Sequence, residues 1–360
     1  MASLTREQII DVLRTVNDPE IGRDIVTLNM VKTVAVCDGH VRVHVELTTP
    51  ACPLKEPIRR DVEAAVRTLQ ADAKVEVEFS ARVRGGPSRP APIPGVKNII
   101  AVGAGKGGVG KSTLAVLTAV GLRRTGAAVG LLDADVYGPS VPKMMGLEGV
   151  QPTVTDDGNK LRPLEACGVR TMSIGFLVPP DQAVIWRGPL VHRAVKQLLE
   201  EVEWGELDYL VVDLPPGTGD VPLTLSQSVP MTGAVVVCTP QRVALADAIR
   251  AARMYQHLDV DVLGIVENMS YFVAPDTGRE YDLFGKGGAE IVARELGVPF
   301  LGSLPINVAI RIAGDRGTPA DVFADGGEGL ADAAMKVIAN LAGQISVHNA
   351  RMENAEAAAR

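Results

Sequence analysis

Residues 105–113 read Gly-Lys-Gly-Gly-Val-Gly-Lys-Ser-Thr, a spacing typical of a loop that binds the phosphates of a nucleotide. Its glycines let backbone N–H groups converge on phosphate oxygens without Cβ clashes, and the helix expected near Lys111 adds its positive end. Lys111 stands where the β- and γ-phosphates are contacted, and the Ser112 hydroxyl stands where Mg²⁺ is held. The loop also contains a second lysine, Lys106, although a single phosphate-binding loop requires only one. The predicted nucleotide-binding residues are Gly105, Lys106, Gly107, Gly108, Val109, Gly110, Lys111, Ser112 and Thr113.

Two acidic elements follow apolar runs. Asp213 ends the run Tyr209–Val212 and opens a loop rich in proline and glycine, so it could hold the metal, sense the γ-phosphate and rearrange on hydrolysis. Asp133 and Asp135 close another apolar run, and carboxylates at a spacing of two on a strand end point the same way. They could position a water or a metal-bound water. The plainer alternatives are a capping role for Asp213 and solvated turns for Asp133 and Asp135.

These residues need a sheet to position them. Short apolar runs alternate with helical stretches, which is typical of strands buried on both faces of a parallel sheet. The sequence therefore predicts an α/β fold, a parallel sheet with helices on both faces, and ligands at the carboxyl ends of its strands. The predicted strands are 98–102, 128–132, 209–212, 234–238 and 262–266.

A smaller α+β domain is predicted before this fold, over residues 1–82. It contains a helix after Thr5, two strands around an Asp38-Gly39 turn, a helix over 55–69 and a third strand. Residues 83–96 form a linker rich in proline and glycine, which joins neither helix nor sheet. The P-loop ATPase domain is expected over 97–345, and residues 346–360, polar and rich in alanine, as a frayed tail.

Composition narrows the function classes. The chain has 360 residues and a net charge of −7, which argues against dedicated nucleic-acid binding. No apolar run approaches the ~20 residues of a membrane helix, and the N-terminus shows no apolar signal core. Four scattered cysteines do not form a disulfide framework. We therefore expect a cytoplasmic protein without a membrane partner.

Beyond the loop, several motifs make the chain resemble the Mrp/ApbC-type iron–sulfur cluster carrier ATPases, a family within the wider MinD, ParA and nitrogenase iron protein group. The N-terminal segment resembles the small MIP-type domain, through Asp18-Pro-Glu20 and Thr49-Pro-Ala-Cys-Pro53. In the larger domain the matching motifs are Asp133-Ala-Asp-Val-Tyr-Gly-Pro-Ser140, Trp186-Arg-Gly-Pro189, Asp213-Leu-Pro-Pro-Gly-Thr-Gly-Asp220, Thr239-Pro-Gln241, Glu267-Asn-Met-Ser270 and Leu304-Pro-Ile-Asn307.

The resemblance implies a homodimer with ATP and Mg²⁺ at its interface, and iron–sulfur apoproteins or assembly factors as further partners. Lys106 matches the signature lysine that reaches the partner subunit's γ-phosphate, which would account for the surplus charge. Asp135 matches the residue that orients the attacking water, and Asp213 matches the aspartate on the metal side. Asn268 matches an adenine contact, and Lys111 completes the implied catalytic set.

The chain departs from the family at the cluster site. Carriers usually have two cysteines separated by two residues just after the Asn-Met-Ser element, and two subunits then supply four thiolates. Here those positions hold Ala274 and Thr277, and neither side chain replaces a thiolate. Cys52 lies between two prolines and matches a cysteine typical of the small domain, so it is either a cluster or reactive thiol or a plain loop cysteine. The other cysteines, expected to be packed small hydrophobes, are Cys37, Cys167 and Cys238.

Three functions remain open from the sequence. The first is an ATP-hydrolysing carrier that transfers iron–sulfur clusters to apoproteins or assists their assembly, with the cluster itself uncertain. The second is a metal-free, ATP-gated switch that binds partners and has lost the cluster site. The third, a partitioning ATPase acting on DNA or membrane, is disfavoured because the chain shows no basic amphipathic C-terminal helix.

Overall fold

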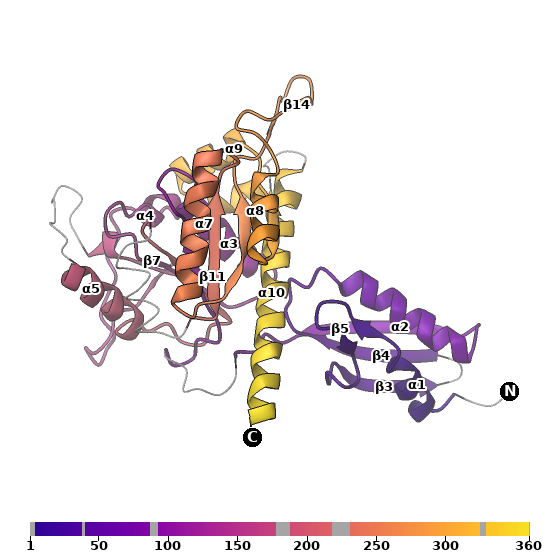
Figure 1. Cartoon of the computed structure of the whole chain (residues 1–360). Coiled ribbons are helices and arrows are strands. Elements are labelled where there is room, and N and C mark those ends of the chain that lie inside the picture. Colours follow the sequence, from indigo (N-terminus) through magenta and orange to yellow (C-terminus); the bar gives the residue numbers. More distant parts are fainter. Residues whose placement is uncertain are drawn as a thin grey trace.

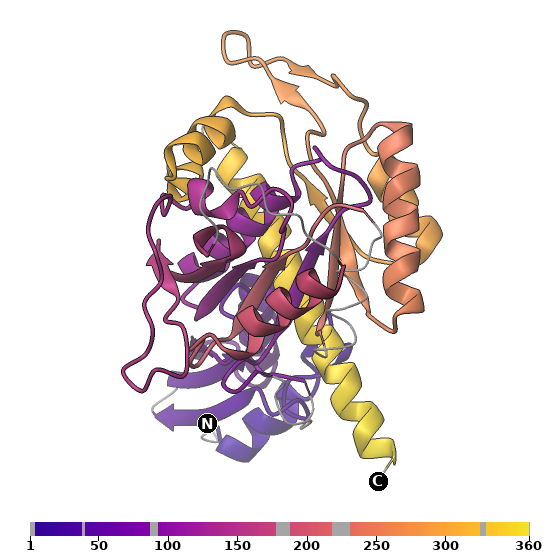
Figure 2. The same cartoon turned by 90° about the vertical axis from the view of Figure 1, so that its left-hand side faces the viewer.

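The computed structural model describes residues 4–37, 40–86, 93–177, 188–217, 231–324 and 329–359. These form a small N-terminal domain and a large α/β domain (Figure 1). In Figure 1 and Figure 2 alike, the small domain lies beside the C-terminal half of the last helix, away from the protruding β13–β14 hairpin. Within the described ranges, no helix combines the length and apolar character that crossing a bilayer requires.

The small domain is a three-stranded sheet packed against two helices. Its central strand pairs antiparallel with one neighbour and parallel with the other. Alternate residues of this strand, Val41, Val43 and Val45, are buried, which confirms the predicted period of two. Thr5 and Gln8 form the predicted capping box. The elements are α1 (Arg6–Leu13), β1 (Asn17–Asp18), β2 (Arg23–Asp24), β3 (Val31–Cys37), β4 (His40–Leu47), α2 (Lys55–Leu69) and β5 (Lys74–Ala81).

The large domain is built on an eight-stranded sheet in the order β15-β12-β11-β6-β10-β7-β9-β8. All neighbours in it are parallel except β8, which pairs antiparallel with β9 at one edge. The predicted parallel sheet is thus correct apart from this edge strand. The strands are β6 (Ile99–Gly103), β7 (Val129–Asp133), β8 (Leu164–Ala166), β9 (Val169–Ser173), β10 (Tyr209–Asp213), β11 (Gly233–Cys238), β12 (Val262–Glu267) and β15 (Phe300–Ser303), with a separate hairpin of β13 (Phe272–Val273) and β14 (Glu280–Tyr281).

Helices cover both faces of this sheet, as predicted. Side chains of the central strand β6 alternate between the faces: Ile100 and Val102 pack with α3 and α10, and Ile99 and Ala101 with α5, α7 and α8. The helices are α3 (Lys111–Arg124), α4 (Val141–Met144), α5 (Gly188–Glu200), α7 (Arg242–His257), α8 (Gly288–Leu296), α9 (Val308–Arg316) and α10 (Leu330–Ala359), with two 3₁₀ turns, Ile174–Phe176 and Pro319–Phe323.

The expected frayed tail over 346–360 is wrong, because α10 continues to Ala359. Buried residues recur at helical spacing along it, from Leu341 and Ile345 on the sheet to Asn349, which is only 4% exposed. Asn349 donates a hydrogen bond to Asn98 Oδ1 at 2.9 Å. The polar, alanine-rich composition that suggested fraying is that of a helix lying between two domains.

The small domain contacts the large one at several points. Thr49 Oγ1 and the Tyr209 hydroxyl lie 3.1 Å apart and are hydrogen bonded, and both residues are buried. Arg23 Nη1 donates to Asn354 Oδ1 of α10 at 3.2 Å. The carboxylate of Glu20 lies so close to Gly343 that a Cβ there would fall 2.3 Å from its Oε1. The glycine therefore lets the small domain approach α10.

Candidate functional site

The phosphate loop joins the end of β6 to the start of α3, as its sequence predicts. Gly108 and Gly110 both have a left-handed backbone, with φ of +81° and +85°. A Cβ on Gly110 would lie 2.1 Å from Asn268 Nδ2, and a Cβ on Gly105 would lie 2.1 Å from the Asp247 carbonyl oxygen of α7. Backbone conformation therefore favours glycine at Gly108 and Gly110, and close approach of another residue requires it at Gly105 and Gly110.

Lys111 is the first residue of α3, and its ammonium group is buried among carboxylates. Its Nζ lies 2.6 Å from Asp213 Oδ1 and 3.5 Å from Asp135 Oδ2, and it donates to Ser112 Oγ at 3.2 Å. Lys111 is 6% exposed and Asp213 is fully buried. The structure thus brings together four predicted site residues from three different elements.

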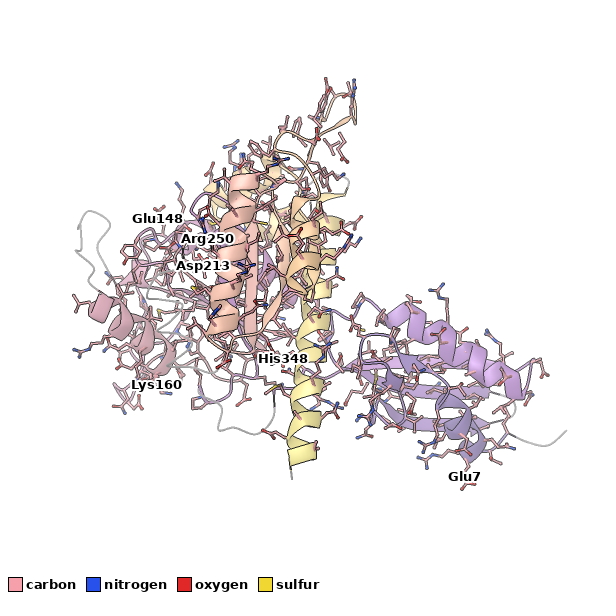
Figure 3. The ribbon with its side chains drawn as sticks, viewed as in Figure 1. Glu7, Glu148, Lys160, Asp213, Arg250 and His348 are labelled. Atoms are coloured by element: carbon pink, nitrogen blue, oxygen red, sulfur yellow. The ribbon has the colours of Figure 1, made fainter. Side chains whose placement is uncertain are left out.

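Asp213 ends β10 inside the large domain (Figure 3). Its Oδ2 atom is buried and accepts no hydrogen bond within the described part of the chain. Burial raises the pKa of the Asp213 carboxyl, and the neighbouring Lys111 ammonium opposes that shift. A buried carboxylate oxygen without a partner, beside the Ser112 hydroxyl, is the donor chemistry that Mg²⁺ prefers, so the residues present fit this ion.

Asp133 and Asp135 separate into two roles, although their spacing suggested one. Asp133 is fully buried and organises the following loop, since its carboxylate accepts hydrogen bonds from the Asp135 and Val141 backbone N–H groups and from the Ser173 hydroxyl. Burial and the nearby Asp213 charge raise the pKa of Asp133 to about 7. Asp135 is the carboxylate that faces Lys111.

Ser173 is a site residue that the sequence reasoning missed. It ends β9, the strand next to β7, and its hydroxyl lies 3.0 Å from Asp133 Oδ2. Its signal in the sequence was weak, because a serine after a short apolar run is common. Only the pairing of β9 with β7 brings it to Asp133.

Asn268 follows β12 and contacts the phosphate loop directly. Its Nδ2 donates to the Val109 carbonyl at 2.8 Å, and both residues are buried. The structure thus places Asn268 at the loop, where it holds the backbone. Its adenine contact stays a prediction.

The remaining loop residues differ in exposure. Gly107 and Gly108 are exposed, while Lys106, Ser112 and Thr113 are half-buried. Within the described ranges Lys106 forms no ion pair, in contrast to Lys111. The two lysines of the loop therefore have different electrostatic surroundings.

The positions where the family has its cysteine pair lie on the β13–β14 hairpin, which protrudes from the large domain (Figure 1). Ala274 and Thr277 are in its turn, where the Gly278 N–H donates to the Ala274 carbonyl at 2.8 Å. Glu267 holds the base of this segment, since its carboxylate accepts hydrogen bonds from Ser270 Oγ and from the Gly287 and Ala289 N–H groups. The two positions thus lie in an exposed hairpin turn and carry side chains that supply no thiolate.

The four cysteines lie apart in the fold. Cys238 is buried, as expected, but Cys37 and Cys167 are exposed, so their predicted packing is wrong. Cys167 lies in the turn between β8 and β9, with a φ of +52°. Burial raises the pKa of the half-buried Cys52 thiol to about 11, which keeps it protonated at neutral pH. Among the described residues, no group of three or more His, Cys, Asp or Glu side chains could hold a metal ion.

Two predicted motifs lie partly or mostly outside the described residues. The Trp186-Arg-Gly-Pro189 motif has its first two residues there, and the loop opened by Asp213 leaves the described ranges after Gly217.

Residues 95–342 match the family described as NUBPL iron-transfer P-loop NTPase, of the ParA type. Residues 6–79 match a second family, described as iron–sulfur cluster assembly protein. The two matches fall on the large and the small domain respectively. Together they span most of the chain.

Curated relatives match over almost the whole length. An iron–sulfur cluster carrier protein of Synechocystis is 51% identical over 349 residues, which is 96% of this chain and 99% of that protein. One of Deinococcus radiodurans is 52% identical over 341 residues, covering 95% and 96%. Among solved structures, a nucleotide-binding protein of Archaeoglobus fulgidus in complex with ADP is 42% identical with a TM-score of 0.56. That match covers 62% of this chain and 88% of the other.

Proposed function

Since this chain belongs to the NUBPL-type iron-transfer P-loop NTPase family, we propose that it is an ATP-hydrolysing homodimer that binds iron–sulfur clusters and transfers them to apoproteins or assists their assembly. The observation that carries the proposal is the cluster of Lys111, Ser112, Asp135 and Asp213 at the end of the phosphate loop, in which the lysine and both aspartates are buried. The ADP complex of the Archaeoglobus relative supports nucleotide binding at the matching domain.

The proposed hydrolysis uses four residues of this chain. Lys111 exchanges Asp213 for the β- and γ-phosphate oxygens when ATP binds, which frees the Asp213 carboxylate. Ser112 and Asp213 would hold Mg²⁺, and the bound ion would supply positive charge beside the phosphates. Asp135, at the edge of the same group, orients the attacking water.

Lys106 is proposed to act across the dimer. Its ammonium group lies in the same loop as Lys111 but has no carboxylate partner in the described structure, so no internal ion pair competes for it. A cation supplied by a second subunit stabilises transition-state charge as an arginine finger does.

Cluster binding needs thiolates from elsewhere than the hairpin, because Ala274 and Thr277 supply none. Cys52 and cysteines of a client protein are the proposed sources. The raised pKa of Cys52 opposes thiolate formation, so a bound iron ion must itself displace the proton. The names of the relatives described above give no support to the metal-free switch, which stays the alternative outcome of the test.

The test is anaerobic reconstitution with iron and sulfide. Wild type, Cys52→Ala and the matched control Cys37→Ala are compared by visible absorption, bound iron and transfer of cluster to an apo-ferredoxin. We expect charge-transfer absorption that is lost in Cys52→Ala and kept in Cys37→Ala. Absence of any chromophore in wild type, with ATP hydrolysis intact, would support the metal-free switch instead.

A further inference from the structure

A cavity of about 260 Å³ lies between the small domain and α10, away from the phosphate loop. Both domains line it: the small domain contributes Met30, the segment that follows it contributes Arg84, and α10 contributes Ile345 and Asn349. Tyr209, at the start of β10, closes it from the sheet. The cavity is slightly smaller than the ~300–1,000 Å³ of sites for drug-sized ligands, which suits a small metabolite.

The charged side chains around this cavity favour an anion. Two guanidinium groups line it, from Arg23 and Arg84, against one carboxylate, from Glu353. The half-buried Arg84 side chain forms no ion pair within the described ranges, and Arg23 is tied only to the neutral amide of Asn354. Guanidinium groups bind carboxylate and phosphate oxygens with two parallel hydrogen bonds, and that capacity of Arg84 is unused here.

Asn349 gives a second, independent indication of a ligand, because its buried side-chain oxygen has no hydrogen-bond donor in the described part of the chain. Its Nδ2 donates to two acceptors, the Arg84 carbonyl at 3.0 Å and Asn98 Oδ1 at 2.9 Å, which fixes the orientation of the amide. Its Oδ1 is buried and accepts no hydrogen bond in the described part of the chain. A buried acceptor without a donor is costly, so a hydroxyl or N–H group entering this cavity would satisfy it.

We propose that this cavity binds a small organic anion, a carboxylate or a phosphate monoester that also carries a hydroxyl or N–H donor. The anionic group binds Arg84 and Arg23, the donor binds Asn349 Oδ1, and the carbon skeleton packs on Met30 and Ile345. Because both domains line the cavity, the ligand joins the small domain to α10. This proposal does not depend on ATP hydrolysis or on cluster transfer.

The experiment is calorimetric titration of the full-length protein with four probes, in the presence of excess ADP and Mg²⁺. Malate and glycerol 3-phosphate carry an anion and a hydroxyl, and they separate a carboxylate ligand from a phosphate ligand. Inorganic phosphate lacks the carbon skeleton, and glycerol lacks the anion. We expect malate or glycerol 3-phosphate to bind at least about tenfold more tightly than glycerol, as charged hydrogen bonds imply.

Two pairs of variants locate the binding. Arg84→Ala removes the unpaired guanidinium, with Arg82→Ala as the matched control, since Arg82 is exposed and outside the cavity. Ala350→Phe fills the cavity from α10, and Ala355→Phe places the same side chain at an exposed position of that helix. We expect the first variant of each pair to weaken binding about tenfold or more, and its control to leave it unchanged.

Melting curves of each variant are needed to check that it is folded. The proposal is overturned if no probe binds folded wild type, if glycerol binds as tightly as the anions, or if binding survives both Arg84→Ala and Ala350→Phe. Binding of inorganic phosphate alone, insensitive to these variants, assigns the anion to the phosphate loop and overturns the proposal too.

Discussion

Lys111 Nζ lies 2.6 Å from Asp213 Oδ1, so the cation of the phosphate loop is held by a buried carboxylate at the end of the adjacent strand. The second lysine of the loop, Lys106, forms no such pair in the described structure. Substituting Lys111 therefore removes a buried ion pair, whereas substituting Lys106 removes only an ammonium group without a carboxylate partner in the described structure.

We expect Lys106→Ala to lower ATP hydrolysis about 10³-fold or more while nucleotide affinity stays within a few-fold of wild type. Lys111→Ala should abolish measurable nucleotide binding, because it removes the cation that meets the phosphates. Phosphate release and fluorescent-ADP titration measure the two effects. Normal turnover of Lys106→Ala would contradict the role across the dimer.

Gly108 and Gly110 allow a steric effect to be separated from backbone strain. Both have φ above +80°, but a Cβ on Gly108 meets nothing within 4 Å, whereas one on Gly110 meets Asn268 Nδ2. Alanine should therefore cost about 1–2 kcal/mol of unfolding free energy at Gly108, and more at Gly110. Chemical denaturation measures both.

The double variant Gly110→Ala/Asn268→Ala is the control for this clash. It should recover part of the loss, since it removes the atom that the new Cβ meets. Equal destabilisation by Gly108→Ala and Gly110→Ala would show that the Asn268 side chain moves away from the new Cβ at no cost in stability.

Glu20 should make stability depend on pH. Its burial against α10 and the neighbouring Asp18 charge raise the pKa of Glu20 to about 7, from 4.5. The folded state then holds a proton that the unfolded state has lost between these values, so this contribution to stability is full below about pH 4.5 and is lost as pH rises through about 7. The half-buried Cys52 nearby stays protonated over this range and adds no charge.

Glu20→Gln should flatten this decline, as followed by urea denaturation at a series of pH values. The exposed Glu7, on α1, is the matched control, and Glu7→Gln should leave the decline in place. An unchanged slope in Glu20→Gln would refute the assignment of the proton to this carboxyl.

The double variant Ala274→Cys/Thr277→Cys tests whether the hairpin keeps the geometry of a cluster site. We expect it to gain iron and charge-transfer absorption on anaerobic reconstitution, with about two copies of the chain per cluster, since four thiolates are needed. Each single variant serves as a control and should gain much less. Failure of the double variant to bind iron would show that the hairpin has changed in more than its two side chains.

Much of the nucleotide site followed from the sequence, because its signals are local. Glycine spacing predicted the turn after β6, and apolar runs predicted the strands that carry Asp133 and Asp213. The role of Ser173 was not predictable, since it depends on β9 pairing with β7 across a long connection. The exposure of Cys167 was not predicted, because it lies in a turn that follows the antiparallel edge strand β8.

The course of α10 was also missed, for a different reason. Its last turns contain few apolar residues, so periodicity gave little signal for a packed helix. The partners that bury Asn349 are Asn98 and Arg84, which lie far away in the chain. A helix that is buried through polar contacts between domains shows no periodic pattern of apolar residues in its sequence.

Strand β10 has the Thr49 contact at its first residue, Tyr209, and the Lys111 ion pair at its last, Asp213. Four residue steps of about 3.3 Å separate them, or about 13 Å along a strand hydrogen-bonded on both sides. The hydrogen bond to the small domain and the ion pair with Lys111 therefore lie at opposite ends of one strand, with no loop between them.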